Sequence, residues 1–298
     1  MSNEWQYHLL KALSRLICLL PYACVVKLGR SLGFLYWYIA PKQRRRGIRQ
    51  MKERLGLSQE AAAAVMRRLC GNLGQTFLEI MFTPKLDAQR ISQLVEIENR
   101  QYLEDAVARG HGVVFLTAHI GNWEWLGAAL SMAGFPMTSV IKRQPNDQHT
   151  RLLNEYRERV GIEIFARGTT ELIGAAKAMK KGKILGFLAD QDAGVDGLFL
   201  DFFGKPASTP LGPAVFARKF KAPVMPVFIV HKPDYSGHRV LIYPPLEYEN
   251  TGEEKEDLRR LTLQMTQLLE EVIREHPDEW IWFQKRWNTK VDGSCEEA

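Results

Sequence analysis

The side chains best suited to acid–base chemistry are His119 and Glu124, which follow the apolar run VVFLTA. On one continuous helix they would lie about 140° apart and would not meet. If His119 ends a strand, Gly121 permits a tight turn and Glu124 falls in the first helical turn, the two can face each other. A carboxylate bonded to one ring nitrogen fixes the tautomer and raises the basicity of the other. The spacing therefore predicts a general base that takes a proton from a hydroxyl group.

The turn after His119 also offers binding groups. A helix that begins near Asn122 presents free N–H groups, which can hold a phosphate or a developing oxyanion. We therefore count Asn122 as a candidate substrate-binding residue and the N–H groups of 121–123 as candidates for an oxyanion site. The alternative is that His119 is a turn histidine and Glu124 a solvated helical residue, because this spacing often occurs by chance.

Other polar side chains also follow apolar runs. Arg143 follows 137–141 and offers a planar fork suited to phosphate, although it could equally be a solvated loop residue. Arg167 is a second candidate at the same rim. Asp190 and Asp192 follow ILGFLA and could orient a sugar hydroxyl or hold a basic partner. No nearby His or Glu completes a metal ligand set with them, so we expect neither a metal nor another cofactor.

The elements that must position these residues alternate from residue 113 onward between short apolar runs and helical patterns. This indicates an α/β fold with a mixed, largely parallel central sheet flanked by helices. Ligands of such sheets bind beyond the carboxyl ends of the strands, where the candidates lie. The expected strands are 113–118, 137–141, 162–166, 184–189, 224–230 and 239–243, and the expected helices are 50–82, 122–133, 149–160, 170–179 and one spanning 258–273.

The composition narrows the class of protein. With 298 residues, 46% hydrophobic and 25% charged, the chain is not disordered. The formal net charge of +6 suggests an acidic partner: an anionic membrane, a phosphorylated substrate, an acidic carrier protein or nucleic acid. Nucleic acid is the least favoured, since the basic residues lack interleaved stacking aromatics. The four cysteines have neither zinc-site nor redox spacing.

The N-terminal segment 5–46 combines helical apolar patterns with aromatic residues and the basic run KQRRR at 42–46. Neither of its apolar stretches reaches the 18–20 or so uninterrupted residues of a comfortable membrane span. We expect amphipathic helices on, or dipping into, the cytoplasmic face of a membrane. A helical cap packed on the globular core is the alternative. The expected division is a membrane-associating part, 1–46, and a catalytic domain, 47–298.

Taken together, these motifs resemble a known family. HIGNWE (119–124) has the H-x₄-[D/E] pattern of the lysophospholipid acyltransferase superfamily, in the form found in its bacterial lipid A biosynthesis (lauroyl/myristoyl) branch. The resemblance continues in order through IKRQPND (141–147), ADQDAG (189–194), FFGKPASTPLGPA (202–214) and PDEWIWFQKRW (277–287). Five ordered blocks are far more specific than the first one alone.

The resemblance implies transfer of a fatty acyl chain from an acyl carrier protein thioester, or acyl-CoA, to a hydroxyl of a phosphorylated glycolipid, a lipid A precursor. It also implies an inner-membrane location and a phosphate-binding role for Arg143. His119, held by Glu124, would deprotonate the acceptor. No covalent acyl-enzyme is expected, because G-x-S-x-G is absent.

The last block departs from the family pattern at Gln284, Lys285 and Arg286, where the lipid A enzymes often have a histidine and two arginines. This departure concerns the acceptor and not the reaction, so another glycolipid or a lysophospholipid is an alternative acceptor. A non-catalytic lipid-binding protein of the same fold is an alternative function. We expect Lys285 and Arg286 on the solvated surface, unless an acidic carrier protein docks there, and the nearby tryptophans mostly in the core, unless some of them line an acyl groove.

Overall fold

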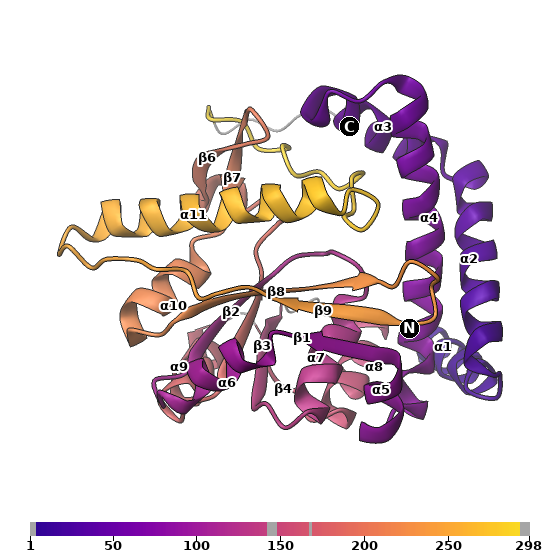
Figure 1. Cartoon of the computed structure of the whole chain (residues 1–298), viewed down its shortest axis with the longest axis horizontal. Coiled ribbons are helices and arrows are strands. Elements are labelled where there is room, and N and C mark those ends of the chain that lie inside the picture. The colour runs from indigo at the N-terminus through magenta and orange to yellow at the C-terminus, as the bar shows by residue number, and fades with distance from the viewer. Residues whose placement is uncertain (1–3, 142–147, 167–168, 293–298) are drawn as a thin grey trace.

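The computed structural model describes residues 4–141, 148–166 and 169–292. Its central sheet has the order β1-β9-β8-β2-β5-β3-β4 (Figure 1). Every neighbouring pair is parallel except β8 and β9, so the predicted mixed, largely parallel α/β fold is confirmed. The strands are β1 (Val95–Glu98), β2 (Val113–Thr117), β3 (Met137–Ile141), β4 (Glu163–Ala166), β5 (Ile184–Leu188), β8 (Val224–His231) and β9 (His238–Ile242); β6 (Leu198–Phe202) and β7 (Lys205–Thr209) form a separate hairpin.

Helices cover both faces of the sheet. In Figure 1 the sheet is seen nearly edge-on, with α11 and the β6–β7 hairpin above it and α5, α7 and α8 below it. The N-terminal helices α2 and α4 stand at one side. The helices are α1 (Glu4–Ile17), α2 (Tyr22–Ile39), α3 (Pro41–Leu55), α4 (Gln59–Phe82), α5 (Ala88–Leu94), α6 (Arg100–Ala108), α7 (Trp123–Met132), α8 (Gln148–Arg159), α9 (Thr169–Lys180), α10 (Gly212–Phe220) and α11 (Glu254–Glu275).

Residues 50–82, which were expected to be helical with Ser58 as an N-cap before the alanine run, belong to two helices, because the chain breaks between α3 and α4. Gly56 ends α3 with φ of +68°, a left-handed conformation that glycine adopts without strain. The Ser58 hydroxyl then accepts the N–H of Ala61 and caps α4, as its position before the alanine run suggested. The hairpin β6–β7 and the edge strand β1 were also not expected. The sequences of β1 (VEIE) and β7 (KPAST) carry no distinctive apolar run, whereas the apolar residues of β6 (LFLDF) were overlooked as a strand signal.

The N-terminal helices have two different faces. On the inner face, α2 lies against α4 so closely that a Cβ on Gly33 would come within 2.0 Å of the Cys70 carbonyl oxygen. Among the described residues, no helix is both long and apolar enough to cross a bilayer. The outer face exposes large apolar side chains to solvent. The N-terminal helices therefore pack on the core and also present an exposed apolar surface. These side chains are Trp5, Leu9, Leu13, Leu16, Leu19, Leu20, Leu28, Leu32, Leu35, Tyr38 and Ile39.

A buried carboxylate, that of Glu79 on α4, ties several of these elements together. It accepts hydrogen bonds from Tyr22 Oη (2.7 Å), Gln75 Nε2 (2.8 Å), Asn122 Nδ2 (2.8 Å) and His238 Nε2 (2.9 Å). Burial raises the pKa of Glu79, but the neighbouring histidines and these donors outweigh burial and lower the pKa to about 2. The ionised group therefore joins α2, α4 and β9 to the turn before α7.

Removing this carboxylate should destabilise the whole protein. Glu79→Ala leaves several buried donors without an acceptor, so we expect the free energy of unfolding to fall by about 3–5 kcal/mol. Glu271→Ala, at an exposed glutamate of α11, should change it by less than about 0.5 kcal/mol. Chemical denaturation measures both values. Equal, small changes in the two variants would show that the Glu79 network does not stabilise the fold.

Candidate active site

The turn between β2 and α7 positions His119, as the sequence predicted. Gly121 has φ of +57°, and a Cβ there would lie 2.2 Å from the Ile229 carbonyl oxygen, so only glycine fits. The N–H of Gly121 donates to the Glu279 carbonyl oxygen (3.0 Å). Asn122 then caps α7, since its Oδ1 accepts the N–H of Trp125 (3.0 Å). The turn is thus fixed on one side by the Glu279 carbonyl oxygen and on the other by the Asn122 side chain.

The carboxylate that holds the His119 ring belongs to Asp190. Asp190 follows β5, which pairs in parallel with β2, so the two residues meet at the same sheet edge. The distance from His119 Nδ1 to Asp190 Oδ1 is 2.8 Å. An ionised carboxylate only accepts hydrogen bonds, so Nδ1 carries the proton and Nε2 is the basic nitrogen. The Asp190 side chain is completely buried, whereas that of His119 is 17% exposed.

Three further donors fix the other oxygen of Asp190. Its Oδ2 accepts the backbone N–H of His119 (3.1 Å), the indole N–H of Trp280 (2.9 Å) and the amide of Gln284 (3.2 Å). Both C-terminal residues lie in the block PDEWIWFQKRW. Burial raises the pKa of Asp190, but the neighbouring imidazole and these donors outweigh it and lower the pKa to about 2. Asp190 is therefore ionised at neutral pH.

The electrostatics favour a basic imidazole. Burial lowers the pKa of His119, but the attraction and hydrogen bond of Asp190, with a smaller contribution from the Glu124 charge, outweigh burial, and the pKa is raised above its ordinary value of 6.5. The exposed Gln191 amide nitrogen lies 3.5 Å from Nε2. The edge of the Trp123 ring packs against the imidazole, with ring centroids 4.9 Å apart.

Glu124 does not make the hydrogen bond that the sequence analysis expected. Its carboxylate pairs with the guanidinium of Arg157 on α8 through both Nε (2.8 Å) and Nη2. Asp190 makes the hydrogen bond to the imidazole that was expected of Glu124, because β5 lies beside β2. The first turn of α7 directs Glu124 toward α8. Glu124 still acts on His119 through its charge. Its requirement for catalysis stays a prediction.

The other predicted residues have varied positions. Asn122 is buried, and its amide bonds Glu79 and Trp125, so it has a structural role instead of the expected substrate contact. The Gly121 N–H already donates to the Glu279 carbonyl oxygen. In the described residues, no acceptor contacts the backbone N–H groups of Trp123 and Glu124.

The remaining predicted residues are two arginines and Asp192. Asp192 accepts a hydrogen bond from the Thr289 hydroxyl (2.7 Å), and its Oδ1 is buried without a partner. Two predicted residues, Arg143 and Arg167, lie outside the described residues.

Arg286 is not on the surface as expected. Lys285 is exposed, but Arg286 is buried, where its guanidinium donates to the Ser208 carbonyl oxygen and to Thr209 Oγ1 (2.7 Å). Burial lowers the pKa of Arg286 to about 10. Arg286 therefore fastens the C-terminal segment to the β6–β7 hairpin.

The roles of Trp280 and Gln284 were also missed. The tryptophans of this segment were expected mostly in the core. Because a buried indole N–H needs an acceptor, a polar partner for Trp280 could have been predicted from the sequence.

One group among the described residues has metal-ligand chemistry. Glu79, His231 and His238 present ligand atoms within 4.8 Å of one another, and all three are buried. His238 bonds Glu79, while His231 Nδ1 lies 2.8 Å from a carboxylate oxygen of Glu279. These hydrogen bonds hold the three side chains in place, while His231 Nε2 and His238 Nδ1 are buried without a partner among the described residues. None of the three side chains bonds Asp190.

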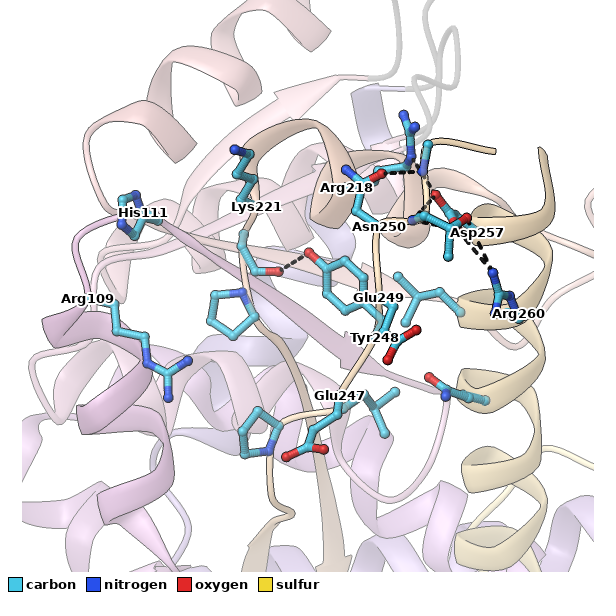
Figure 2. Close-up of a pocket in the computed structure, with 18 residues that line it drawn as sticks. Arg109, His111, Arg218, Lys221, Glu247, Tyr248, Glu249, Asn250, Asp257 and Arg260 are labelled. Carbon is cyan, nitrogen blue, oxygen red and sulfur yellow. Dashed lines mark hydrogen bonds and ion pairs between the residues drawn. The ribbon is translucent and has the colours of Figure 1, made fainter. Parts of the chain in front are cut away.

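A large cavity of about 1370 Å³ lies at the opposite end of the sheet (Figure 2). His111, which lines it, precedes β2, whereas His119 follows that strand, so the strand, about 17 Å long, lies between the two residues. Its walls carry both cations and carboxylates, among them Arg109, Lys221 and Glu247. The cavity is not the site that His119 and Asp190 form.

Comparison with known proteins supports a lipid acyltransferase. The family model of the bacterial lipid A biosynthesis acyltransferases matches residues 1–289. This chain belongs to that family. The chain is 26% identical to the lipid A biosynthesis palmitoleoyltransferase of Escherichia coli (92% of this chain, 88% of the relative) and 24% identical to its lauroyltransferase (93% and 90%). It is also 26% identical to the phosphatidylinositol mannoside acyltransferase of Mycolicibacterium smegmatis (75% and 72%). The chain is therefore an acyltransferase.

The His119–Asp190 pair predicts the pH dependence of this acyltransferase. A general base works when neutral, so activity falls as the pH drops through the pKa of His119. Because that pKa is raised, the acid limb of kcat/KM should lie above pH 6.5. Asp190→Asn removes the charge that raises the pKa, so the limb should move to lower pH while the plateau falls by about 10²–10⁴-fold.

The matched control is Asp192→Asn, which leaves the imidazole contact intact and should leave the acid limb in place. An acid limb that Asp190→Asn does not move would contradict the assignment of Asp190 to the ring.

Proposed function

We propose that this protein is an O-acyltransferase that moves a fatty acyl chain from an acyl carrier protein thioester to a hydroxyl of a phosphorylated glycolipid of the lipid A precursor class. The observation that carries the proposal is an imidazole held through Nδ1 by a buried carboxylate, which makes Nε2 the basic nitrogen, in a chain of this family. The relatives named for lipid A biosynthesis match nearly the whole chain and support this acceptor class.

In the proposed mechanism, His119 Nε2 accepts the proton of the acceptor hydroxyl. The oxygen attacks the thioester carbonyl, the new C–O bond forms, and the C–S bond breaks. The imidazolium then returns its proton to the leaving thiolate. Asp190 keeps the ring in the Nδ1–H tautomer and stabilises its positive charge during the reaction, so Asp190 is a positioning residue.

The oxyanion and the acceptor phosphate need separate partners. The N–H groups of Trp123 and Glu124, at the start of α7, are suited to the developing oxyanion. We assign the phosphate to Arg143 on the basis of the block IKRQPND, and we keep Arg167, which follows β4 in the sequence, as a second cation. Asp192 is kept as a candidate for a sugar hydroxyl because its Oδ1 has no partner among the described residues.

We also propose that the protein lies on the cytoplasmic face of the inner membrane through the outer surface of α1 and α2. The support is the set of exposed apolar side chains on α1, on α2 and in the turn between them, including Leu19 in the turn (78% exposed) and Ile39 (70% exposed). Surfaces of this kind bury their apolar side chains at the boundary between headgroups and acyl chains.

A second acceptor, another glycolipid, has its own support in the similarity to phosphatidylinositol mannoside acyltransferases. Mass spectrometry of lipid A from a deletion strain separates the two acceptors. Loss of one acyl chain from lipid A is the result expected for the proposed function. An unchanged acyl count would favour the other glycolipid.

Replacing the proposed base should abolish transfer. We expect His119→Ala to lower turnover by about 10²–10⁴-fold in an assay of purified protein with acyl-carrier-protein donors and lipid A precursors. Glu124→Ala should also lose most activity, because the part-buried Arg157 loses its partner and His119 loses a nearby negative charge. Circular dichroism checks the fold. Wild-type turnover in either folded variant would refute its assigned role.

The membrane surface can be tested separately. Leu16→Ser/Leu19→Ser removes two exposed apolar side chains, each worth up to about 1.5–3 kcal/mol when buried, so vesicle binding should weaken at least tenfold. Val195→Ser, at a valine that is 70% exposed but outside α1 and α2, is the control and should bind as wild type. Co-sedimentation with phospholipid vesicles measures both. Equal binding by all three proteins would place the membrane contact elsewhere.

A further inference from the structure

The basic excess of the chain is concentrated on α3. This helix carries seven cations and the single carboxylate of Glu53. Its formal charge of +6 equals that of the entire chain, so the other 283 or so residues together are neutral. The cations are Lys42, Arg44, Arg45, Arg46, Arg49, Lys52 and Arg54.

Four of these cations form a stripe on the outer side of α3. Lys42, Arg45, Arg49 and Lys52 are spaced by three, four and three residues, which places them within about 80° of one another around the helix. All four are exposed. Glu53 lies 4.0 Å from Arg49, and no other carboxylate contacts the stripe in the part of the chain that the structure describes. We call these four residues the α3 stripe.

The inner side of α3 contacts the segment that supports the active site. Gln50 Nε2 donates to the Gln284 carbonyl oxygen (3.4 Å), and Arg46 Nη1 donates to that of Phe283 (3.4 Å). Gln284 in turn bonds Asp190, which holds His119. The segment that carries Gln284 therefore lies between the inner side of α3 and the catalytic pair. Figure 1 shows α3 at the upper end of α4, beyond the C-terminal end of α11.

The α3 stripe differs chemically from the outer surface of α1 and α2. No large apolar side chain of α3 is prominently exposed, so this helix offers charge without residues that insert among acyl chains. A groove of about 420 Å³ runs beside Arg45, Arg49 and Lys52 and ends at Gln59 on α4. Such a surface is complementary to an acidic helix whose side chains lie along the stripe.

We propose that the α3 stripe is the docking surface for the acidic protein that carries the acyl thioester donor. This inference rests on the proposed function, because that function requires a carrier-bound chain to reach His119. Docking at α3 places the carrier on the helix that packs against the supporting segment of the base, and the carrier's prosthetic arm has to span the distance to His119. The bilayer then contacts α1 and α2 while the carrier occupies α3.

The test is binding of acyl carrier protein loaded with a dodecanoyl chain, measured by titration calorimetry with the full-length protein. Arg45→Glu/Arg49→Glu should weaken binding at least tenfold, and raising the salt concentration should weaken wild-type binding. Lys255→Glu/Arg259→Glu, an equal charge reversal at exposed residues of α11, is the matched control and should bind within twofold of wild type. Arg45→Gln/Arg49→Gln serves if the reversed variant folds poorly.

Co-sedimentation with vesicles of phosphatidylglycerol and phosphatidylcholine gives the second measurement. We expect the stripe variant to bind vesicles within twofold of wild type. Unchanged carrier binding, an equal loss in the α11 control, or a wild-type protein that does not bind the carrier would each overturn the proposal. Loss of vesicle binding with carrier binding intact would assign the stripe to lipid headgroups instead. If carrier binding depends on the α3 stripe but no glycolipid is acylated, the proposed acceptor is refuted and the proposed docking surface is not.

Discussion

The buried carboxylate of Asp190 is the contact on which the proposed chemistry of this protein depends. It determines which nitrogen of His119 carries the proton, and therefore which one is free to act as a base. A carboxylate this far from water would normally be disfavoured as an anion. Here the imidazole, an indole N–H, a side-chain amide and a backbone N–H all stabilise it. The C-terminal segment thus contributes to a site whose base lies more than 150 residues earlier in the chain.

A second buried carboxylate, that of Glu79, fixes the backbone around the same site. It bonds Asn122 at the start of α7 and His238 on β9, while the Glu279 carbonyl oxygen accepts the Gly121 N–H. The His119 turn is therefore held by α4, by β9 and by the C-terminal segment. Because α2 joins the same network through Tyr22, the N-terminal helices are part of the support of the site. A division of the chain into 1–46 and 47–298 remains a prediction, and these contacts show how closely the two parts are packed.

Much of the fold and part of the site could be predicted from local sequence. The strands β2, β3 and β5 were predicted within one residue of their observed ends, because each is a compact apolar run. The tight turn at Gly121 was also correct. The partner of His119 was not, since H-x₄-E suggests a local contact while the actual contact depends on which strand lies beside β2. Sheet order is a tertiary property that sequence spacing does not contain. For the same reason Arg286 looked like a surface residue, although the β6–β7 hairpin buries it.

Nuclear magnetic resonance of the His119 ring nitrogens in the full-length protein directly observes which nitrogen carries the hydrogen. We expect a neutral ring with its hydrogen on Nδ1 and a titration midpoint above 6.5. Asp190→Asn should lower that midpoint. A neutral ring with its hydrogen on Nε2, or a midpoint at or below 6.5 in the wild type, would contradict the assignment of Asp190 as the residue that prepares His119 to act as a base.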